Sequence, residues 1–141
     1  MRILGLDVGT KRIGVAISDE LGWTARGIKT LHRGSGESDL REIRDIARGY
    51  GVEKIVVGLP ANMNGSLGPQ AEIALGFVRE LRQIVDLPII TWDERLSTLE
   101  ATKMLIRANL SRKKRKPKVD MTAAIIILQS YLNSLSRKEN P

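Results

Sequence analysis

Cysteine is absent from this 141-residue sequence, and His32 is the only histidine. These absences exclude disulfide bonds within the chain and thiolate metal sites, and they leave too few nitrogen or sulfur ligands for a zinc centre. A chain without cysteine fits a reducing compartment, so we expect a cytoplasmic protein. Aromatic residues make up only 4% of the chain, which argues against base stacking in the manner of single-strand binding proteins.

Long hydrophobic runs are absent as well. The longest apolar stretch, residues 123–128, is far shorter than the roughly 20 residues that a membrane-spanning helix needs. The apolar run near the N-terminus is interrupted by Asp7 and is not followed by a small-residue cleavage site, so we do not expect a signal peptide. We therefore expect no contact with a membrane, and the length predicts one domain covering residues 1–141.

Positive charge, by contrast, is abundant and unevenly distributed. The chain has 23 Lys and Arg against 16 Asp and Glu, a net charge of +7. Residues 112–118, with the sequence Arg-Lys-Lys-Arg-Lys-Pro-Lys, contain no acidic group at all. Such a run is usually a solvated stretch, and we expect it to form a flexible basic loop. Its charge favours a polyanionic partner whose phosphates are contacted without reading sequence.

Hydrophobic periodicity indicates the secondary structure. Short apolar runs bounded by turn residues predict strands at 1–8, 12–18, 23–31, 54–58 and 87–92. Helical spacing predicts one helix that ends at 49–51 and three later helices that cover about 70–85, 97–108 and 120–135. We expect a frayed polar tail at 136–141.

The order of these elements predicts an α/β fold. Strands joined by short turns are expected to pair antiparallel, whereas strands separated by a helix are expected to be parallel crossovers. The result is a five-stranded mixed sheet, with three antiparallel strands followed by parallel crossovers, and with helices on both faces. Ligands of such sheets gather at the carboxyl ends of the parallel strands.

Three acidic residues fall at junctions that meet at this edge. Asp7 lies inside the first apolar run, Glu94 follows the last predicted strand, and Asp120 opens the closing helix. Carboxylates are the ligands that Mg²⁺ prefers, and a pair of such ions can hydrolyse a phosphodiester bond. The pattern therefore predicts a divalent-metal nuclease in which Asp7 bridges the ions and Glu94 and Asp120 complete the site.

Each acid also has a plain structural interpretation. Asp7 would be satisfied by backbone N–H groups of the following turn, although burying a charge is costly. Asp93 and Glu94 would be a solvated pair in front of a helix, where acids are mildly stabilising. Asp120 would be a helix N-cap and nothing more. The agreement of all three on one edge favours the metal site.

Basic and amide side chains near the same edge are candidates for contacts with nucleic acid. Lys11 and Arg12 follow the turn after Asp7, although Lys is also common at strand edges. Arg95 either orients Glu94 or binds a phosphate, and a surface salt bridge is the alternative. The full set is Lys11, Arg12, Asn62, Arg95, Arg112, Lys113, Lys114, Arg115, Lys116 and Lys118.

Four motifs resemble those of the YqgF family of bacterial ribonuclease-H-like proteins. The motifs are Leu-Gly-Leu-Asp-Val-Gly-Thr-Lys-Arg at 4–12, Val-Gly-Leu-Pro at 57–60 with Asn62 and Gly65, Asp-Glu-Arg-Leu-Ser-Thr at 93–98, and Val-Asp at 119–120 with the helix behind it. The resemblance covers nearly the whole chain, in the right order.

The resemblance implies a ribonuclease-H-like fold and an endonuclease that uses Mg²⁺ or Mn²⁺, with Asp7, Glu94 and Asp120 as the carboxylates. It implies processing of the pre-16S rRNA 5′ end on a structured RNA or a ribosomal particle, as a monomer or homodimer. The family is also described as Holliday junction resolvases acting on branched DNA. True junction resolvases carry a fourth acid one turn after the third, and 121–124 contain none, which weakens that alternative.

Two interpretations from other classes remain. The first motif also resembles the phosphate loop of actin-like ATPases and sugar kinases, but those proteins need two such domains, and this chain has one copy of the motif. The other interpretation is a non-catalytic module that binds RNA or ribosomes. The sequence leaves the choice of RNA or DNA, the metal and the oligomeric state open.

Overall fold

The computed structural model describes residues 1–34, 37–96 and 112–139, with the backbone alone at 112–120 and 137–139. Its elements are β1 (Ile3–Val8), β2 (Arg12–Ser18), β3 (Ala25–His32), α1 (Ser38–Tyr50), β4 (Lys54–Leu59), α2 (Pro69–Arg82), β5 (Ile89–Asp93), the short 3₁₀ helix η1 (Glu94–Leu96) and α4 (Arg112–Glu139). The helix predicted at 97–108 lies outside the described residues.

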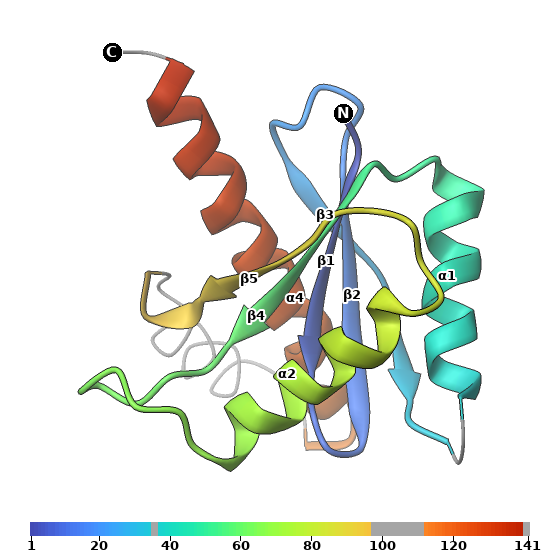
Figure 1. The fold of residues 1–141 in the computed structure, drawn as a ribbon, viewed down its shortest axis with the longest axis vertical. Helices are drawn as coiled ribbons and strands as arrows, with labels where there is room; N and C mark the ends of the chain where they lie inside the picture. Colours follow the sequence, from blue (N-terminus) through green and yellow to red (C-terminus); the bar gives the residue numbers. More distant parts are fainter. Residues whose placement is uncertain (35–36, 97–111, 140–141) are drawn as a thin grey trace.

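The sheet has five strands in the order β3-β2-β1-β4-β5 (Figure 1). β1 pairs antiparallel with β2, and β2 antiparallel with β3. β4 pairs parallel with both β1 and β5. The predicted mixed sheet is therefore confirmed, because the length of the connection between two strands determines how they pair. Because β1, β4 and β5 are parallel, their carboxyl ends lie along the same edge of the sheet, which runs from the β5 arrowhead at the left to the β1 arrowhead near the bottom in Figure 1.

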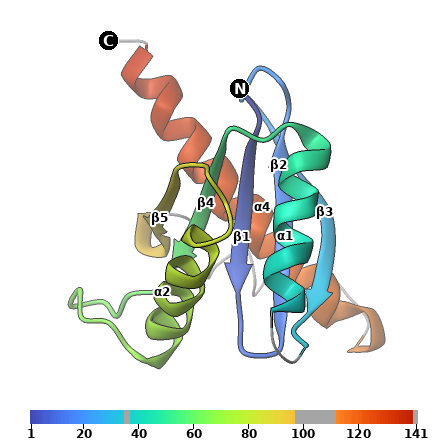
Figure 2. The ribbon, with the colours of Figure 1, turned by 45° about the vertical axis from the view of Figure 1, so that its right-hand side comes forward.

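Helices cover both faces of the sheet (Figure 2). α1 and α2 pack on one face, around a cluster that includes Leu6, Ile43 and Phe77. α4 packs on the other face through Ala124, Leu128 and their neighbours. None of the helices in the described ranges combines the length and the hydropathy that crossing a membrane would require.

Three glycines allow α4 to lie close to the sheet. A Cβ atom at Gly27 of β3 would lie 2.5 Å from Met121, one at Gly5 of β1 would lie 2.7 Å from Leu128 Cβ, and one at Gly58 of β4 would lie 2.5 Å from Ile127 Cδ1. Real Cβ atoms are not found at such separations. A side chain at Gly5 would press on atoms close to the helix backbone, whereas one at Gly27 or Gly58 would first displace a side chain of the helix, so glycine is needed most strictly at Gly5.

α4 differs from its prediction at both ends. It begins at Arg112 and ends at Glu139, so the run 112–118, predicted as a loop, forms its first turns, and part of the predicted tail continues it. Apolar periodicity marks only the part of a helix that packs on a core. Lys and Arg have high intrinsic helix propensity, so a helix can extend through basic sequence that carries no periodic signal.

Smaller shifts at other boundaries have local causes. β3 begins at Ala25 rather than Trp23, because the Asp19 carboxylate accepts a hydrogen bond of 2.7 Å from the Trp23 N–H and holds that residue in the turn. α1 ends where predicted: its last residue is Tyr50, and Gly51, which caps it, has a φ of 66°. This left-handed conformation is the one that glycine adopts without strain.

Candidate active site at the carboxyl edge of the sheet

Asp7 lies on the central strand between two residues that have no side chain. Its partner on β2 is Gly14. On the other side Leu6 is level with Val57 of β4, so the next residue, Gly58, lies beside Asp7. Leu6 belongs to the cluster under α1 and α2, and side chains alternate along a strand. The half-buried Asp7 side chain therefore points to the face that α4 covers.

Glu94 reaches the same position from β5. It is the first residue of η1, directly after the strand ends at Asp93. A Cβ atom at Gly58 would lie 3.2 Å from Glu94 Oε2 and close to Ile127 of α4. The Glu94 carboxylate thus lies above β4, on the α4 face. The structure brings Asp7 and Glu94 to opposite sides of one glycine.

The turn that carries Glu94 is held by α4. Ser130 accepts a hydrogen bond of 3.0 Å from Trp92 Nε1 and donates one of 3.2 Å to the Leu96 carbonyl. The Trp92 ring also meets Tyr131 edge-on, with 5.4 Å between the ring centres. One serine therefore connects the residues on either side of Glu94. Sequence reasoning missed Ser130, because a serine in mid-helix carries no signal of such a role.

Asp120 lies on α4 directly before Met121, the residue that packs over Gly27 of β3. Its helix covers the face on which Asp7 and Glu94 lie, and its own side chain is outside the described part. Among the side chains that the structure does describe, no three histidines or carboxylates are grouped to hold a metal ion. A group of three carboxylates at this site would need Asp120, whose side chain is not among those that the structure describes.

The described residues fit a hard divalent cation. Two carboxylates lie at one end of the sheet, Asp7 beside Gly14 of β2 and Glu94 Oε2 over Gly58 of β4. Mg²⁺ and Mn²⁺ take oxygen ligands and need only one or two carboxylates per ion. Asp7 and Glu94 are the described residues that would hold such an ion.

The predicted nucleic-acid contacts fall at the same edge where they are described. Lys11 is exposed and Arg12 half-buried, both beside the turn in which the Gly9 N–H donates to the Arg12 carbonyl at 2.8 Å. Asn62 is exposed in the loop after β4. The backbone of 112–118 forms the first turns of α4, drawn in orange at the lower end of the sheet in Figures 1 and 2.

Arg95 has a set of close partners. Its Nε lies 3.1 and 3.0 Å from the two carboxylate oxygens of Asp93, and its Nη2 lies 2.6 Å from Oδ2. Nη1 donates to the Met63 carbonyl at 3.3 Å. The hydrogen bonds from Arg95 lower the pKa of Asp93 below its ordinary value, and the same pairing raises the pKa of Arg95.

Arg33 is a second residue that sequence reasoning missed. Its Nε donates to Asp39 at 3.0 Å, its Nη1 donates to the Gly9 carbonyl at 3.2 Å, and its backbone N–H donates to the Lys11 carbonyl at 2.8 Å. The guanidinium also lies over the Phe77 ring. Arg33 thus holds the turn that follows Asp7. Arg33 lies in a polar loop, and no pattern in the sequence indicates that it would contact Asp39 and Gly9.

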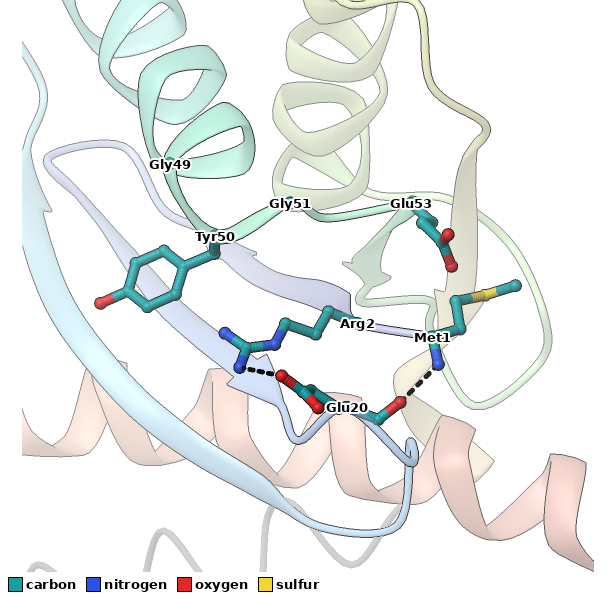
Figure 3. A pocket seen from close by; sticks show the side chains of 7 residues that line it. All are labelled: Met1, Arg2, Glu20, Gly49, Tyr50, Gly51 and Glu53. Carbon is teal, nitrogen blue, oxygen red and sulfur yellow. Dashed lines mark hydrogen bonds and ion pairs between the residues drawn. The ribbon is translucent and has the colours of Figure 1, made fainter.

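A pocket of about 440 Å³ lies at the opposite end of the sheet (Figure 3). It is lined by Met1, Arg2, Glu20, Gly49, Tyr50, Gly51 and Glu53. Arg2 and Glu20 face each other in an ion pair of 3.2 Å, and the Met1 amine donates to the Glu20 carbonyl. These residues surround the start of β1, whereas Asp7 is near its end, so the pocket does not belong to the carboxylate site.

Comparison with known proteins decides the family. A model of the RuvX family, described as "Holliday junction resolvase", matches residues 1–134. The chain belongs to the RuvX family. A relative from Geobacillus sp. is 56% identical over 136 residues, which cover 95% of this chain and 99% of the relative. One from Desulforamulus reducens is 54% identical over 134 residues, covering 95% and 98%. Both relatives carry the name "Putative pre-16S rRNA nuclease".

Solved structures confirm the fold of this RuvX protein. RuvC from T. thermophilus, in complex with a Holliday junction substrate, aligns with a TM-score of 0.61 over 99% of this chain and 97% of that one, at 16% identity. The Fowlpox virus resolvase aligns with a TM-score of 0.55 over 96% and 99%, at 15% identity. The structural matches confirm the predicted ribonuclease-H-like fold. The RuvX family model and the relatives confirm the resemblance that the motifs showed to the YqgF family, which is the same family.

Proposed function

We propose that this protein is a divalent-metal-dependent endonuclease that acts on pre-16S rRNA in the cytoplasm. The observation that carries the proposal is the placement of Asp7 and Glu94, from β1 and β5, on either side of Gly58 on one face of the sheet. Two carboxylates on a rigid sheet edge are suited to hold a metal ion for phosphodiester hydrolysis. The names of the relatives support RNA as the substrate.

Asp7, Glu94 and Asp120 are the residues that would hold Mg²⁺ or Mn²⁺. When bound there, the metal supplies an activated water and stabilises the leaving oxyanion. Asp7 serves as the most rigid ligand because it lies on the central strand. Glu94 is kept in place by the hydrogen bonds that join Ser130 to the Trp92 side chain before it and to the Leu96 carbonyl after it, so little reorganisation is needed when substrate binds.

Substrate binding is assigned to the basic and amide groups of this edge. Lys11 and Asn62 lie on the loops after β1 and β4, Arg12 is the first residue of β2, and the run 112–118 begins the helix that carries Asp120. Contacts from these groups to phosphates position the backbone without selecting a sequence. The sequence left three interpretations of Arg95, and its ion pair with Asp93 favours the salt bridge over a phosphate contact.

A Holliday junction resolvase is the second candidate. The description of the matching family model favours it, whereas the lack of an acid at 121–124 weighs against it. A resolvase acting on a two-fold junction is expected to be a symmetric dimer. A non-catalytic module that binds RNA is the remaining alternative.

Asp7→Asn tests the proposal, because it keeps the shape of the side chain and removes the ligand charge. Cleavage of a 5′-extended 16S precursor fragment should fall more than about 100-fold, since loss of groups that merely orient a ligand already costs roughly 10- to 100-fold. Affinity measured in EDTA should stay within about twofold, because phosphate contacts dominate binding. Asp45→Asn, at an exposed position of α1, is the matched control.

A four-way DNA junction is incubated in parallel, with Mg²⁺, with Mn²⁺ and with chelator. Metal-dependent cleavage of the RNA alone supports the proposal. Paired symmetric cuts in the junction support the resolvase instead. An Asp7→Asn protein that cleaves as well as the wild type would show that the site is wrongly assigned, and binding without cleavage of either substrate would favour the non-catalytic module.

A further inference from the structure

The loop between β4 and α2 lies beside the carboxylate site and is closed on itself. Ala61 and Leu67 form an isolated antiparallel bridge. Within it, the Asn62 N–H donates to the Ser66 carbonyl at 2.9 Å, and the Gly65 N–H donates to the Asn62 carbonyl at 2.8 Å. This loop, residues 61–67, is therefore a small hairpin with its own hydrogen bonds.

Arg95 connects this hairpin to the end of β5. Its Nη1 donates to the Met63 carbonyl at 3.3 Å, and a Cβ atom at Gly65 would lie 3.7 Å from the same nitrogen. On its other side the guanidinium is bound to both carboxylate oxygens of Asp93. The Arg95 backbone N–H also donates to Asp93 Oδ1 at 2.9 Å. The side chain thus spans from the strand end to the hairpin.

Glu94 lies between the two residues of this pair and points elsewhere. Its Oε2 is above Gly58 of β4, whereas Asp93 pairs with Arg95, and Arg95 reaches the hairpin. Glu94, a candidate metal ligand and the first residue of η1, therefore lies between two residues that are paired with each other. Any rotation of the turn that moved Glu94 would also break the hydrogen bonds of Arg95.

We propose that Arg95, together with Asp93, is a positioning residue that clamps the 61–67 hairpin to the turn carrying Glu94, and that it does not bind phosphate. This role rests on the proposed nuclease function. Arg95 Nε, Nη1 and Nη2 all donate within the protein. A phosphate that took the Nε–Nη2 edge of this guanidinium would have to displace Asp93 and leave its carboxylate without the bidentate partner that planar guanidinium geometry provides.

The clamp predicts that Arg95→Gln and Asp93→Asn act alike. Amide hydrogen exchange of 61–67, measured without metal or substrate, should become roughly two- to fivefold faster in each variant, as expected when a partly exposed ion pair is removed. The double variant should be no faster than either single one, because both remove the same interaction. Arg95→Lys should resemble Arg95→Gln, since an ammonium lacks the two-pronged geometry.

Kinetics separate the clamp from a phosphate contact. Under the clamp, kcat falls by a similar factor in Arg95→Gln and Asp93→Asn, with KM and the salt dependence of binding unchanged. Arg79→Gln, which removes one exposed charge from α2, is the control and should match the wild type. A phosphate contact predicts the reverse, with a salt slope reduced by nearly one in Arg95→Gln and an unchanged kcat in Asp93→Asn.

A reduced salt slope in Arg95→Gln together with an unchanged kcat in Asp93→Asn would overturn the clamp. Amide hydrogen exchange of 61–67 at the wild-type rate in both variants would overturn it as well. Exchange is measured without catalysis, so it tests the clamp even if the wild-type protein cleaves nothing. Faster exchange in a protein without nuclease activity would contradict the proposed function and leave the contact between Arg95 and the hairpin standing as a structural one.

Discussion

At the scale of single residues, buried charge is concentrated where Arg33 meets Asp39. The Asp39 side chain is only 4% exposed and that of Arg33 24%. Asp39 lies in the first turn of α1, and Arg33 extends from the end of β3 to the Gly9 carbonyl. A buried carboxylate without its cation is costly. This pair therefore ties the turn after Asp7 to the helix layer behind the sheet.

Arg33→Met should destabilise the protein by about 3–5 kcal/mol, because it leaves the Asp39 carboxylate buried without its cation. Urea denaturation followed by circular dichroism measures the change. Lys29→Met, which breaks the exposed pair with Glu42 at 2.9 Å, is the control and should cost no more than about 1 kcal/mol. Equal destabilisation in the two variants would mean that burial of Asp39 has no special energetic weight.

At the scale of elements, the packing of α4 on the sheet determines both the fold and the site. The helix lies against Gly5 and Gly58, on adjacent strands. A Cβ at Gly5 would meet Leu128 Cβ at 2.7 Å, an atom next to the helix backbone. A Cβ at Gly58 would meet the end of the Ile127 side chain, which can move, and the Glu94 carboxylate. The two glycines thus differ in what a methyl group would disturb.

Alanine at these two positions should separate stability from activity. Gly5→Ala should cost about 1–3 kcal/mol, the usual penalty of overpacking, with activity of the folded protein retained. Gly58→Ala should cost less stability and should lower metal affinity and cleavage, because the methyl group crowds Glu94 Oε2. Thermal melts and Mn²⁺ titration measure the two effects. Full metal affinity in Gly58→Ala would mean that Glu94 does not hold the ion.

At the scale of the whole molecule, charge and chemistry are placed at one end. The net charge of +7 is concentrated in 112–118, and this segment begins the helix that crosses the sheet. The helix begins near the edge of the sheet at which β1, β4 and β5 end (Figure 1). A polyanion drawn to this basic segment would therefore approach the carboxylates.

Replacing the six basic residues of 112–118 by glutamine should weaken nucleic-acid binding and flatten its dependence on salt. For every phosphate that the segment no longer neutralises, the slope of log K against log salt should decrease by about 0.7–0.9. Fluorescence anisotropy at several salt concentrations gives the slope. The triple variant Arg41→Gln, Arg48→Gln and Arg79→Gln, at exposed positions of α1 and α2, is the control. An unchanged slope would show that the segment does not hold substrate.

The sequence alone determined the order of the described strands and helices, the mixed sheet and the edge at which Asp7 and Glu94 lie. These features follow from local patterns, because apolar periodicity and turn residues act over a few neighbouring positions. The predicted start of the last helix, Asp120, was wrong because the helix begins at Arg112, and residues 112–119 lack the apolar face on which that pattern depends.

Only the tertiary structure decided which polar groups meet. Arg33 finds Asp39 and Gly9, Ser130 joins Trp92 to Leu96, and Arg95 faces Asp93 and Met63. Several of these partners come from elements far apart in the chain. Hydrophobic periodicity is a local pattern, so it does not indicate which distant residues come into contact. The chain thus sets where its carboxylates fall along each strand, whereas packing of the helices and loops sets where those carboxylates point.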